Sequence, residues 1–197
     1  MSQFIESIKV EDQKAFLLDL HQQRVRETFA HFGKECSIDL EKIFKDLEHD
    51  EDGLYKLRIV YDLEGNFRAQ MLPYAFPEIE TFELVENNDF SYDFKFADRT
   101  EFEKMKKKAR AQEIIIVKNG QITDTSFSNL LFLKNQTWYT PKNFLLNGVQ
   151  RQNLLKQGII KETEITLQNL NEFSHFQLIN SMNEFNQDFV YSIEELK

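Results

Sequence analysis

The sequence predicts an α+β protein made of two lobes. Residues 4–10 alternate apolar and polar side chains as a half-buried strand does, and residues 16–32 then follow the spacing of an amphipathic helix. A polar run at residues 86–89 interrupts these patterns near the middle of the chain. Beyond it, the β-branched run at residues 114–117 restarts a strand-rich pattern. We therefore expect an N-terminal α/β lobe over residues 1–88 and a C-terminal lobe over residues 89–197.

The composition is that of an acidic globular protein. Of the 197 residues, 41% are hydrophobic and 29% are charged, and the net charge is −9. Negative charge disfavours phosphate backbones and anionic lipids, so we expect no nucleic-acid and no membrane partner. No run approaches 18 apolar residues, so no membrane span is expected. The single Cys36 excludes an internal disulfide and has no CxxC partner, which favours a reducing, cytoplasmic location and no metal site.

The N-terminal lobe begins with the strand at residues 4–10 and the helix at residues 16–32, which Gly33 ends as a C-cap. Ser37 is the expected N-cap of a second helix, because Leu40, Ile43 and Leu47 fall on one helical face. The remaining elements are a hairpin around residues 64–66 and a strand at residues 80–85.

The C-terminal lobe begins with an expected strand at residues 91–99, in which Tyr92, Phe94 and Phe96 alternate with Lys95. A helix is expected next, and two hairpins follow, the first marked by Asn119-Gly120, whose residues suit a turn that needs positive φ. The expected elements after residue 99 are a helix at 101–111, a strand at 114–117, a hairpin turn at 134–136, a helical run at 153–156 and a strand at 176–179.

A polar cluster is set among these buried strands. Asp124, Ser128 and Asn129 directly precede an apolar run, and Gly148 leads into a helical segment. Buried polar groups cost roughly 1–3 kcal/mol each when they lack partners, so a cluster of this kind indicates a functional site. Outside the cluster, Arg24 reads on the residues alone as a surface residue of a helix, and Lys95 as an outward-facing strand residue.

Several segments resemble the class IV aminotransferases, a pyridoxal-phosphate (PLP) family. The resemblance rests on Asp124 with Ser128-Asn129, on Thr140-Pro141, and on the run Gly148-Val149-Gln150-Arg151. FIESIKV near the N-terminus and His21-Gln22-Gln23-Arg24 resemble two further family motifs. This family includes branched-chain and D-amino-acid aminotransferases and 4-amino-4-deoxychorismate lyase. The resemblance implies a D-amino-acid-aminotransferase-like fold with a shortened N-terminal lobe, an amino-acid-like substrate and a homodimer.

The resemblance also implies roles for individual residues. Lys95 would bond the cofactor and move the proton at the substrate α-carbon, and Asp124 would keep the pyridine nitrogen protonated. Arg24 would contact the cofactor phosphate. The other residues that we expect at the cofactor are Ser128, Asn129, Gly148, the backbone N–H groups of Val149 and Gln150, Asn180 and Ser181.

Three departures from the family pattern leave alternatives open. Asp124 stands where the family usually has Glu, most of the family's first segment is missing, and Arg99 is the nearest residue to a tyrosine or asparagine that follows the lysine. Residues 179–182, Ile-Asn-Ser-Met, are closer to the lyase form of the motif. We therefore favour a lyase that eliminates pyruvate to leave 4-aminobenzoate. The alternatives are a branched-chain or D-amino-acid aminotransferase, a catalytically silent PLP-binding scaffold, and an unrelated α/β domain.

Overall fold

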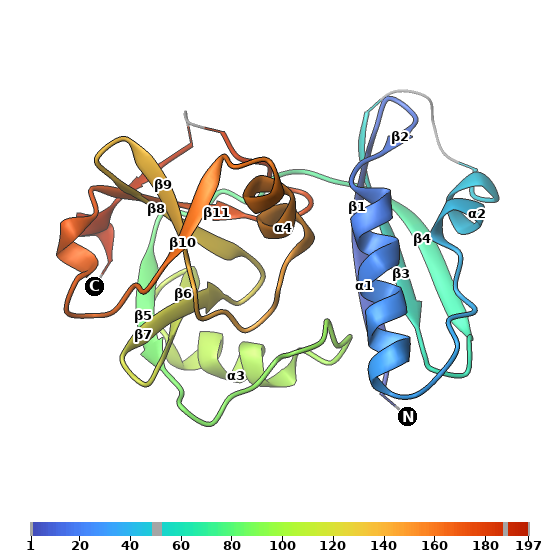
Figure 1. Cartoon of the computed structure of the whole chain (residues 1–197), viewed down its shortest axis with the longest axis horizontal. Coiled ribbons are helices and arrows are strands. Elements are labelled where there is room, and N and C mark those ends of the chain that lie inside the picture. The colour runs from blue at the N-terminus through green and yellow to red at the C-terminus, as the bar shows by residue number, and fades with distance from the viewer. Residues whose placement is uncertain (1, 49–52, 187–188, 197) are drawn as a thin grey trace. The chain divides into compact units, whose positions relative to one another are not determined.

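The computed structural model describes residues 2–48, 53–186 and 189–196 (Figure 1). The chain divides into a first unit, Met1–Phe76 with Phe94–Asp98, and a second unit, Pro77–Asp93 with Arg99–Lys197. Each unit combines helices with mainly antiparallel sheet, which confirms the α+β class. Contacts thus assign residues 77–88 to the second unit and residues 94–98 to the first, whereas the sequence predicted one boundary between residues 88 and 89.

The first unit is a four-stranded antiparallel sheet with a long helix on one face. The strand order is β2-β1-β3-β4, and β1 pairs with β3 along its full length, from Phe4 opposite Tyr61 to Glu11 opposite Leu54. The elements of this unit are β1 (Phe4–Glu11), β2 (Lys14–Ala15), α1 (Leu18–His31), α2 (Leu40–Lys45), β3 (Leu54–Tyr61) and β4 (Phe67–Pro73).

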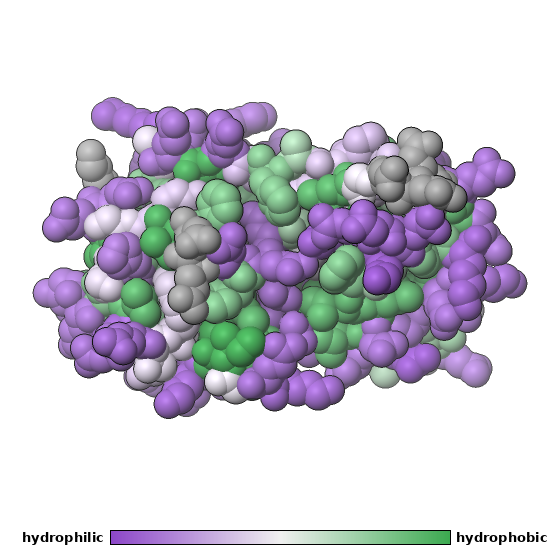
Figure 2. Space-filling model, turned by 90° about the horizontal axis from the view of Figure 1, so that it is seen from above, coloured by the Kyte–Doolittle hydropathy of each residue, from purple (hydrophilic) through white to green (hydrophobic). Residues whose placement is uncertain are grey.

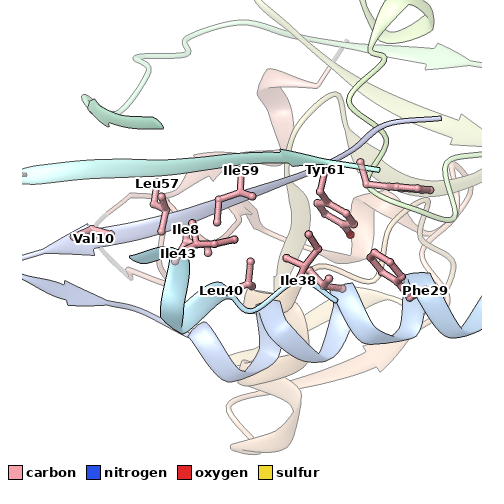
Figure 3. Close-up of a cluster of buried hydrophobic side chains, with 11 residues drawn as sticks. Ile8, Val10, Phe29, Ile38, Leu40, Ile43, Leu57, Ile59 and Tyr61 are labelled. Carbon is pink, nitrogen blue, oxygen red and sulfur yellow. The ribbon is translucent and has the colours of Figure 1, made fainter. Parts of the chain in front are cut away.

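A hydrophobic core lies between this sheet and its helices (Figure 3). Ile8 and Ile59 from the sheet meet Phe29 of α1 and Leu40 of α2, and all four side chains are at most 1% exposed. Because side chains alternate along β1, Glu6 points to the same buried face as Ile8. A carboxylate on the core side of a strand requires charged or polar partners there.

Both helices of the first unit begin later than the sequence predicted. α1 begins at Leu18 rather than residue 16, because the Phe16 backbone N–H bonds the Lys9 carbonyl and Leu17 adopts a left-handed conformation. The expected cap at Ser37 is wrong. Asp39 caps α2 instead, because its side chain accepts the Lys42 backbone N–H at 3.0 Å.

The second unit contains a five-stranded sheet, ordered β10-β9-β8-β11-β12, and a three-stranded sheet, ordered β5-β6-β7. Two pairs are parallel, β5 with β6 and β9 with β10, and α4 lies in the crossover between β9 and β10. The elements are β5 (Phe82–Glu86), α3 (Thr100–Lys108), β6 (Glu113–Lys118), β7 (Gln121–Thr125), β8 (Asn129–Lys134), β9 (Thr137–Pro141), α4 (Val149–Lys156), β10 (Ile160–Thr163), the 3₁₀ turn η1 (Leu170–Glu172), β11 (His175–Ile179), β12 (Tyr191–Ser192) and the 3₁₀ turn η2 (Ile193–Glu195).

Hydrophobic side chains cover both faces of the five-stranded sheet. Phe132 and Phe176 pack toward the three-stranded sheet, in one cluster with Ile115. On the other face, Leu131 packs with Leu154 of α4. Burial on both faces explains why β8 reads as a continuous apolar run. The polar cluster therefore lies at the ends of these strands, where β7 stops and β8 begins.

Three sequence expectations for the second unit need correction. Residues 91–99 form no strand, because the chain there turns to pair with the first unit's β1: the Ile5 N–H bonds the Lys95 carbonyl at 2.9 Å, and Phe96 forms an isolated bridge with Phe4. The helix expected at residues 101–111 is α3, which ends at Lys108. The helix expected at residues 153–156 begins four residues earlier, at Val149.

The surface is mostly polar on the face drawn in Figure 2, with scattered apolar side chains between charged ones. Phe67 and Phe76 are among the exposed large hydrophobic residues. Among the described residues, no helix is long and apolar enough to cross a membrane. The same part of the chain holds no group of His, Cys, Asp and Glu side chains that could bind a metal ion.

Candidate active site

A β-bulge sets the position of Asp124. Ile115 pairs with Thr125, and Val117 pairs with Ile122, so two residues of β7 stand opposite Ile116 of β6. The bulge bends β7 and re-aims its side chains, and Thr123 secures it by donating its hydroxyl to the Ile116 carbonyl at 2.7 Å. Asp124, the second residue of the bulge, is 5% exposed.

Three protein donors hold the Asp124 carboxylate. Oδ1 accepts the Asn129 side-chain amide at 2.8 Å, and Oδ2 accepts the backbone N–H groups of Leu145 and Leu146 at 2.8 and 2.9 Å. Burial raises the pKa of Asp124 to about 6, and these hydrogen bonds limit the rise. With a pKa of about 6, Asp124 is mostly ionised at pH 7. A carboxylate has about four acceptor positions, so Oδ1 can accept one more hydrogen bond.

Asn129 connects Asp124 to the start of α4. Its Nδ2 donates both to Asp124 and to the Leu146 carbonyl, each at 2.8 Å. Its Oδ1 lies so close to Gly148 that a β-carbon at that position would come within 2.1 Å. Gly148 has an ordinary φ of −65°, so the glycine is required by this close approach and not by its backbone conformation.

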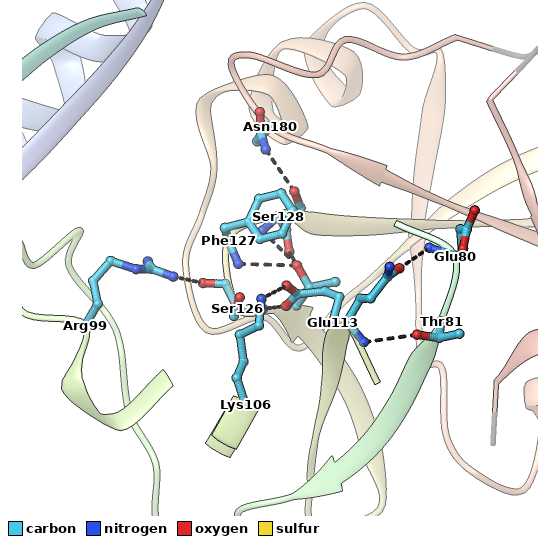
Figure 4. Close-up of polar contacts among 11 residues, drawn as sticks. Glu80, Thr81, Arg99, Lys106, Glu113, Ser126, Phe127, Ser128 and Asn180 are labelled. Atoms are coloured by element: carbon cyan, nitrogen blue, oxygen red, sulfur yellow. Dashed lines mark hydrogen bonds and ion pairs between the residues drawn. The ribbon is translucent and has the colours of Figure 1, made fainter. Parts of the chain in front are cut away.

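Anion-binding groups border the same asparagine. The N–H groups of Val149 and Gln150, in the first turn of α4, have no acceptor within the helix, and a helix N-terminus attracts negative charge. Asn129 also pairs with Ile179 at the end of β11, which brings the following turn alongside. In that turn the Asn180 side-chain amide donates to the Ser128 hydroxyl at 2.9 Å (Figure 4).

The same Asn180 orders its own turn. Its Oδ1 accepts the backbone N–H groups of Met182 and Asn183 at 2.7 and 2.8 Å. Ser181 lies inside this turn and is half-buried. The second unit therefore brings together Asp124, Ser128, Asn129, Gly148, Asn180 and Ser181, six of the residues that the sequence singled out.

In the first unit, Arg24 belongs to a buried charged cluster. Its Nε donates to Glu6 Oε1 at 2.9 Å, and one terminal nitrogen bonds Oε2 of the same carboxylate. His21 Nδ1 lies 2.5 Å from Glu6 Oε2. Burial would raise the pKa of Glu6, but Arg24 and His21 outweigh it and lower the pKa to about 2. Arg24 and His21 are thus the partners that the buried Glu6 carboxylate requires.

Burial lowers the pKa of His21 and so favours its neutral form, although the hydrogen bond to Glu6 opposes that shift. Neutral imidazole has one N–H, and its short contact with Glu6 assigns that hydrogen to Nδ1. Nε2 then has no hydrogen-bond partner among the residues that the structure describes.

Lys95 lies in the same unit as this cluster, half-buried in a bend between Phe94 and Phe96. Its backbone is fixed to β1 through the Ile5 N–H, one residue from Glu6. Its charge contributes to the lowered pKa of His21. The structure therefore holds Arg24 and Lys95 in one unit, while Asp124 and its neighbours belong to the other.

The chain resembles known proteins over most of its length. A family model for class IV aminotransferases matches residues 3–186. The chain belongs to the class IV aminotransferases. An uncharacterised protein of Haemophilus influenzae is 30% identical over 187 residues, which cover 93% of this chain and 99% of the relative. The crystal structure of a candidate 4-amino-4-deoxychorismate lyase from Haemophilus somnus is 34% identical, with a TM-score of 0.86 over 94% of this chain and 98% of that one.

A second solved structure, a hypothetical aminotransferase from Mycobacterium tuberculosis in its PLP-bound form, shares the fold. It has a TM-score of 0.77 at 16% identity, and the match covers 98% of this chain and 81% of that one. Class IV aminotransferases use PLP, and the donors described above fit that molecule. The buried Asp124 carboxylate suits a protonated ring nitrogen, and the start of α4 suits a phosphate.

Some residues of these two polar clusters, one in each unit, were not predicted. The Leu145 and Leu146 backbone amides hold Asp124, yet nothing in their apolar side chains indicates such a role. Glu6 was missed although a signal was present, because the alternation of residues 4–10 already placed it on the buried face with Ile8. Glu113, at 0% exposed, is a third omission.

Proposed function

We propose that this class IV aminotransferase uses Lys95 to bond PLP and Asp124 to hold its ring nitrogen. The observation that carries the proposal is the Asp124 carboxylate: it is buried, ionised at neutral pH and able to accept one more hydrogen bond. PLP, when bound, draws electrons from the bonds at the substrate α-carbon, provided that its ring nitrogen stays protonated. The negative charge of Asp124 favours that protonated form.

The shorter side chain of Asp124 is supported in a way that suits this role. Aspartate reaches one methylene less far than the glutamate of most family members. The bulge in β7 re-aims the residue, and the two amides at residues 145–146 fix Oδ2, which leaves Oδ1 to accept both the Asn129 amide and a further donor such as the ring nitrogen. We therefore expect Asp124 to act directly and not through a water molecule.

The phosphate would be held by both charged and neutral donors. Arg24 has five N–H donors, of which Glu6 takes two, and the negative charge of Glu6 offsets much of its positive charge. Neutral donors then matter: the N–H groups of Val149 and Gln150, and the Ser181 hydroxyl. Ser128, Asn129 and Asn180 order this part of the site through their mutual hydrogen bonds.

We propose a reaction of the aminodeoxychorismate-lyase type. Support comes from the 34% identical candidate lyase, whose match covers 94% of this chain, and from the lyase-like run at residues 179–182. In this reaction Lys95 would remove the proton from the carbon that carries the substrate amino group. The C–O bond at the neighbouring carbon would then break, and the departing enolpyruvate would take up a proton and leave as pyruvate, so that aromatic 4-aminobenzoate remains. Lys95 would serve in both proton transfers, because one amine can act as base and then as acid.

The test is a product assay on purified protein loaded with PLP. With aminodeoxychorismate, equal amounts of 4-aminobenzoate and pyruvate should form, and Lys95→Ala should form neither. Glutamate production from 2-oxoglutarate with a branched-chain or D-amino acid would instead establish an aminotransferase. Cofactor binding without either activity would establish a silent scaffold.

We also propose that the protein is a cytoplasmic homodimer. The family resemblance suggests the dimer, and the single Cys36 suits a reducing compartment. Analytical ultracentrifugation at micromolar concentration should give a mass near twice the 23.5 kDa of the chain. A mass equal to that of one chain would exclude the dimer.

A further inference from the structure

The backbone of one residue in the second unit, Ser126, is held on both sides by charged side chains (Figure 4). The backbone N–H of Ser126 donates to Glu113 Oε1 at 2.8 Å. The Ser126 carbonyl oxygen accepts a hydrogen bond from the Arg99 guanidinium. Hydrogen bonds to charged groups are about twice as strong as neutral ones. Ser126 lies two residues after Asp124, in the turn between β7 and β8.

Both clamping side chains are fixed by further contacts. Glu113 is 0% exposed, and its second oxygen accepts the Lys106 ammonium at 2.7 Å. The Arg99 guanidinium stacks over the Phe102 ring at 4.5 Å. Removing a carboxylate from water carries a large penalty that one ion pair only partly offsets, so a buried Glu113 points to a role beyond stability.

The turn that contains Ser126 is connected to site residues on both sides. Thr125 Oγ1 accepts the N–H groups of Phe127 and Ser128 at 3.3 and 3.0 Å, which closes the turn tightly. Asp124 precedes this turn directly, and Ser128, its last residue, accepts the Asn180 amide. A shift of the Ser126 backbone would therefore move both Asp124 and Ser128, which belong to the proposed cofactor site.

We propose that Arg99 and Glu113 are positioning residues that fix the backbone on both sides of Ser126 and thereby set the orientation of Asp124 and Ser128. The proposal rests on the function proposed above. Neither side chain needs to touch the substrate.

The experiment compares Arg99→Ala, Arg99→Lys, Glu113→Ala and Glu113→Gln with the unaltered protein. PLP is titrated into apoprotein, the dissociation constant is read from cofactor absorbance, and the absorbance of the bound form is followed against pH. The alanine variants should raise the dissociation constant about 10-fold, the size expected from losing one charge-assisted hydrogen bond. The alanine variants should also shift the pH midpoint of the change in bound-cofactor absorbance. Glu113→Gln keeps an oxygen acceptor for the Ser126 N–H and should stay within about 3-fold.

A control separates positioning from general stability. Glu172 pairs with Lys134 at 2.5 Å in the same unit but does not contact the turn, so Glu172→Ala should leave PLP binding unchanged. Thermal unfolding of each apoprotein gives its stability. Unchanged binding and pH midpoint in the Arg99 and Glu113 variants, with only a lower melting temperature, would overturn the positioning role. Failure of the unaltered protein to bind PLP would instead overturn the proposed function and this inference together.

Discussion

Gly148→Ala tests the packing at the centre of the proposed site. The new β-carbon would lie 2.1 Å from Asn129 Oδ1, whereas carbon and oxygen atoms in contact stay more than 3.0 Å apart. The asparagine must therefore move by about 1 Å or more, since van der Waals repulsion rises steeply at such distances. It cannot do so freely, because Nδ2 is bonded on one side to Asp124 and on the other to the Leu146 carbonyl, both at 2.8 Å.

The expected cost follows from those two bonds. Each buried hydrogen bond that is lost costs about 1–3 kcal/mol, so losing both should lower the free energy of unfolding by about 2–6 kcal/mol. Asp124 would also lose the donor on Oδ1. Its pKa, which burial already raises to about 6, should rise further.

Urea unfolding of the apoprotein at pH 7.5 measures this cost, and Gly158→Ala is the matched control. Gly158 follows α4 at φ +70° and would meet nothing within 4 Å, so alanine there adds only left-handed strain, about 1 kcal/mol. Gly148→Ala should be clearly the more damaging of the two. If it costs no more than Gly158→Ala, the close packing of Asn129 against Gly148 is wrong.

Further predictions concern charge and helix capping. Burial gives Asp124 a folded-state pKa of about 6 against an ordinary 3.8, so ionising it should lower the free energy of unfolding of the apoprotein by about 3 kcal/mol as pH rises from 4 to 7. The free energy of unfolding of Asp124→Asn should lack this fall, and the same pH dependence in both proteins would refute the prediction. Despite burial, Arg24 and His21 lower the pKa of Glu6 from 4.5 to about 2, so its ion pairing contributes about 3 kcal/mol above pH 4.5 that is lost as pH falls to 2. Glu6→Gln should therefore unfold more easily at pH 7 but not near pH 2, and an equal deficit at both would contradict this. Asp39→Ala should destabilise α2 by about 1 kcal/mol in thermal unfolding while Ser37→Ala does not, and the reverse order would restore the cap expected from the sequence.

Periodicity predicted the strands and helices well where one face of each is buried. The alternation of residues 4–10 matches β1, and the apolar run before the Asn119-Gly120 turn matches β6. It failed at residues 91–99, where alternating aromatic side chains suggested a strand. There the chain instead leaves one unit to bond β1 of the other, and no local pattern signals such a long-range partner.

For the candidate site, the sequence predicted which residues cluster around Asp124 but not the contacts that hold them in place. Asp124 and Asn129 were singled out together, and a tight turn between two strands brings them together. The bulge that aims Asp124 depends on the pairing register of β6 and β7, which the residues 114–125 do not specify by themselves. The role of the backbone amides at residues 145–146 could not be predicted either, because every residue except proline has such a donor.

The central claim is that Lys95 bonds the cofactor, and borohydride trapping tests it most directly. Purified protein would be incubated with PLP, reduced, digested and analysed by peptide mass. We predict loss of the cofactor's visible absorbance and a single pyridoxyl group on the peptide that contains Lys95. A group fixed on another lysine, such as Lys106 or Lys118, or no fixed group at all, would contradict the account.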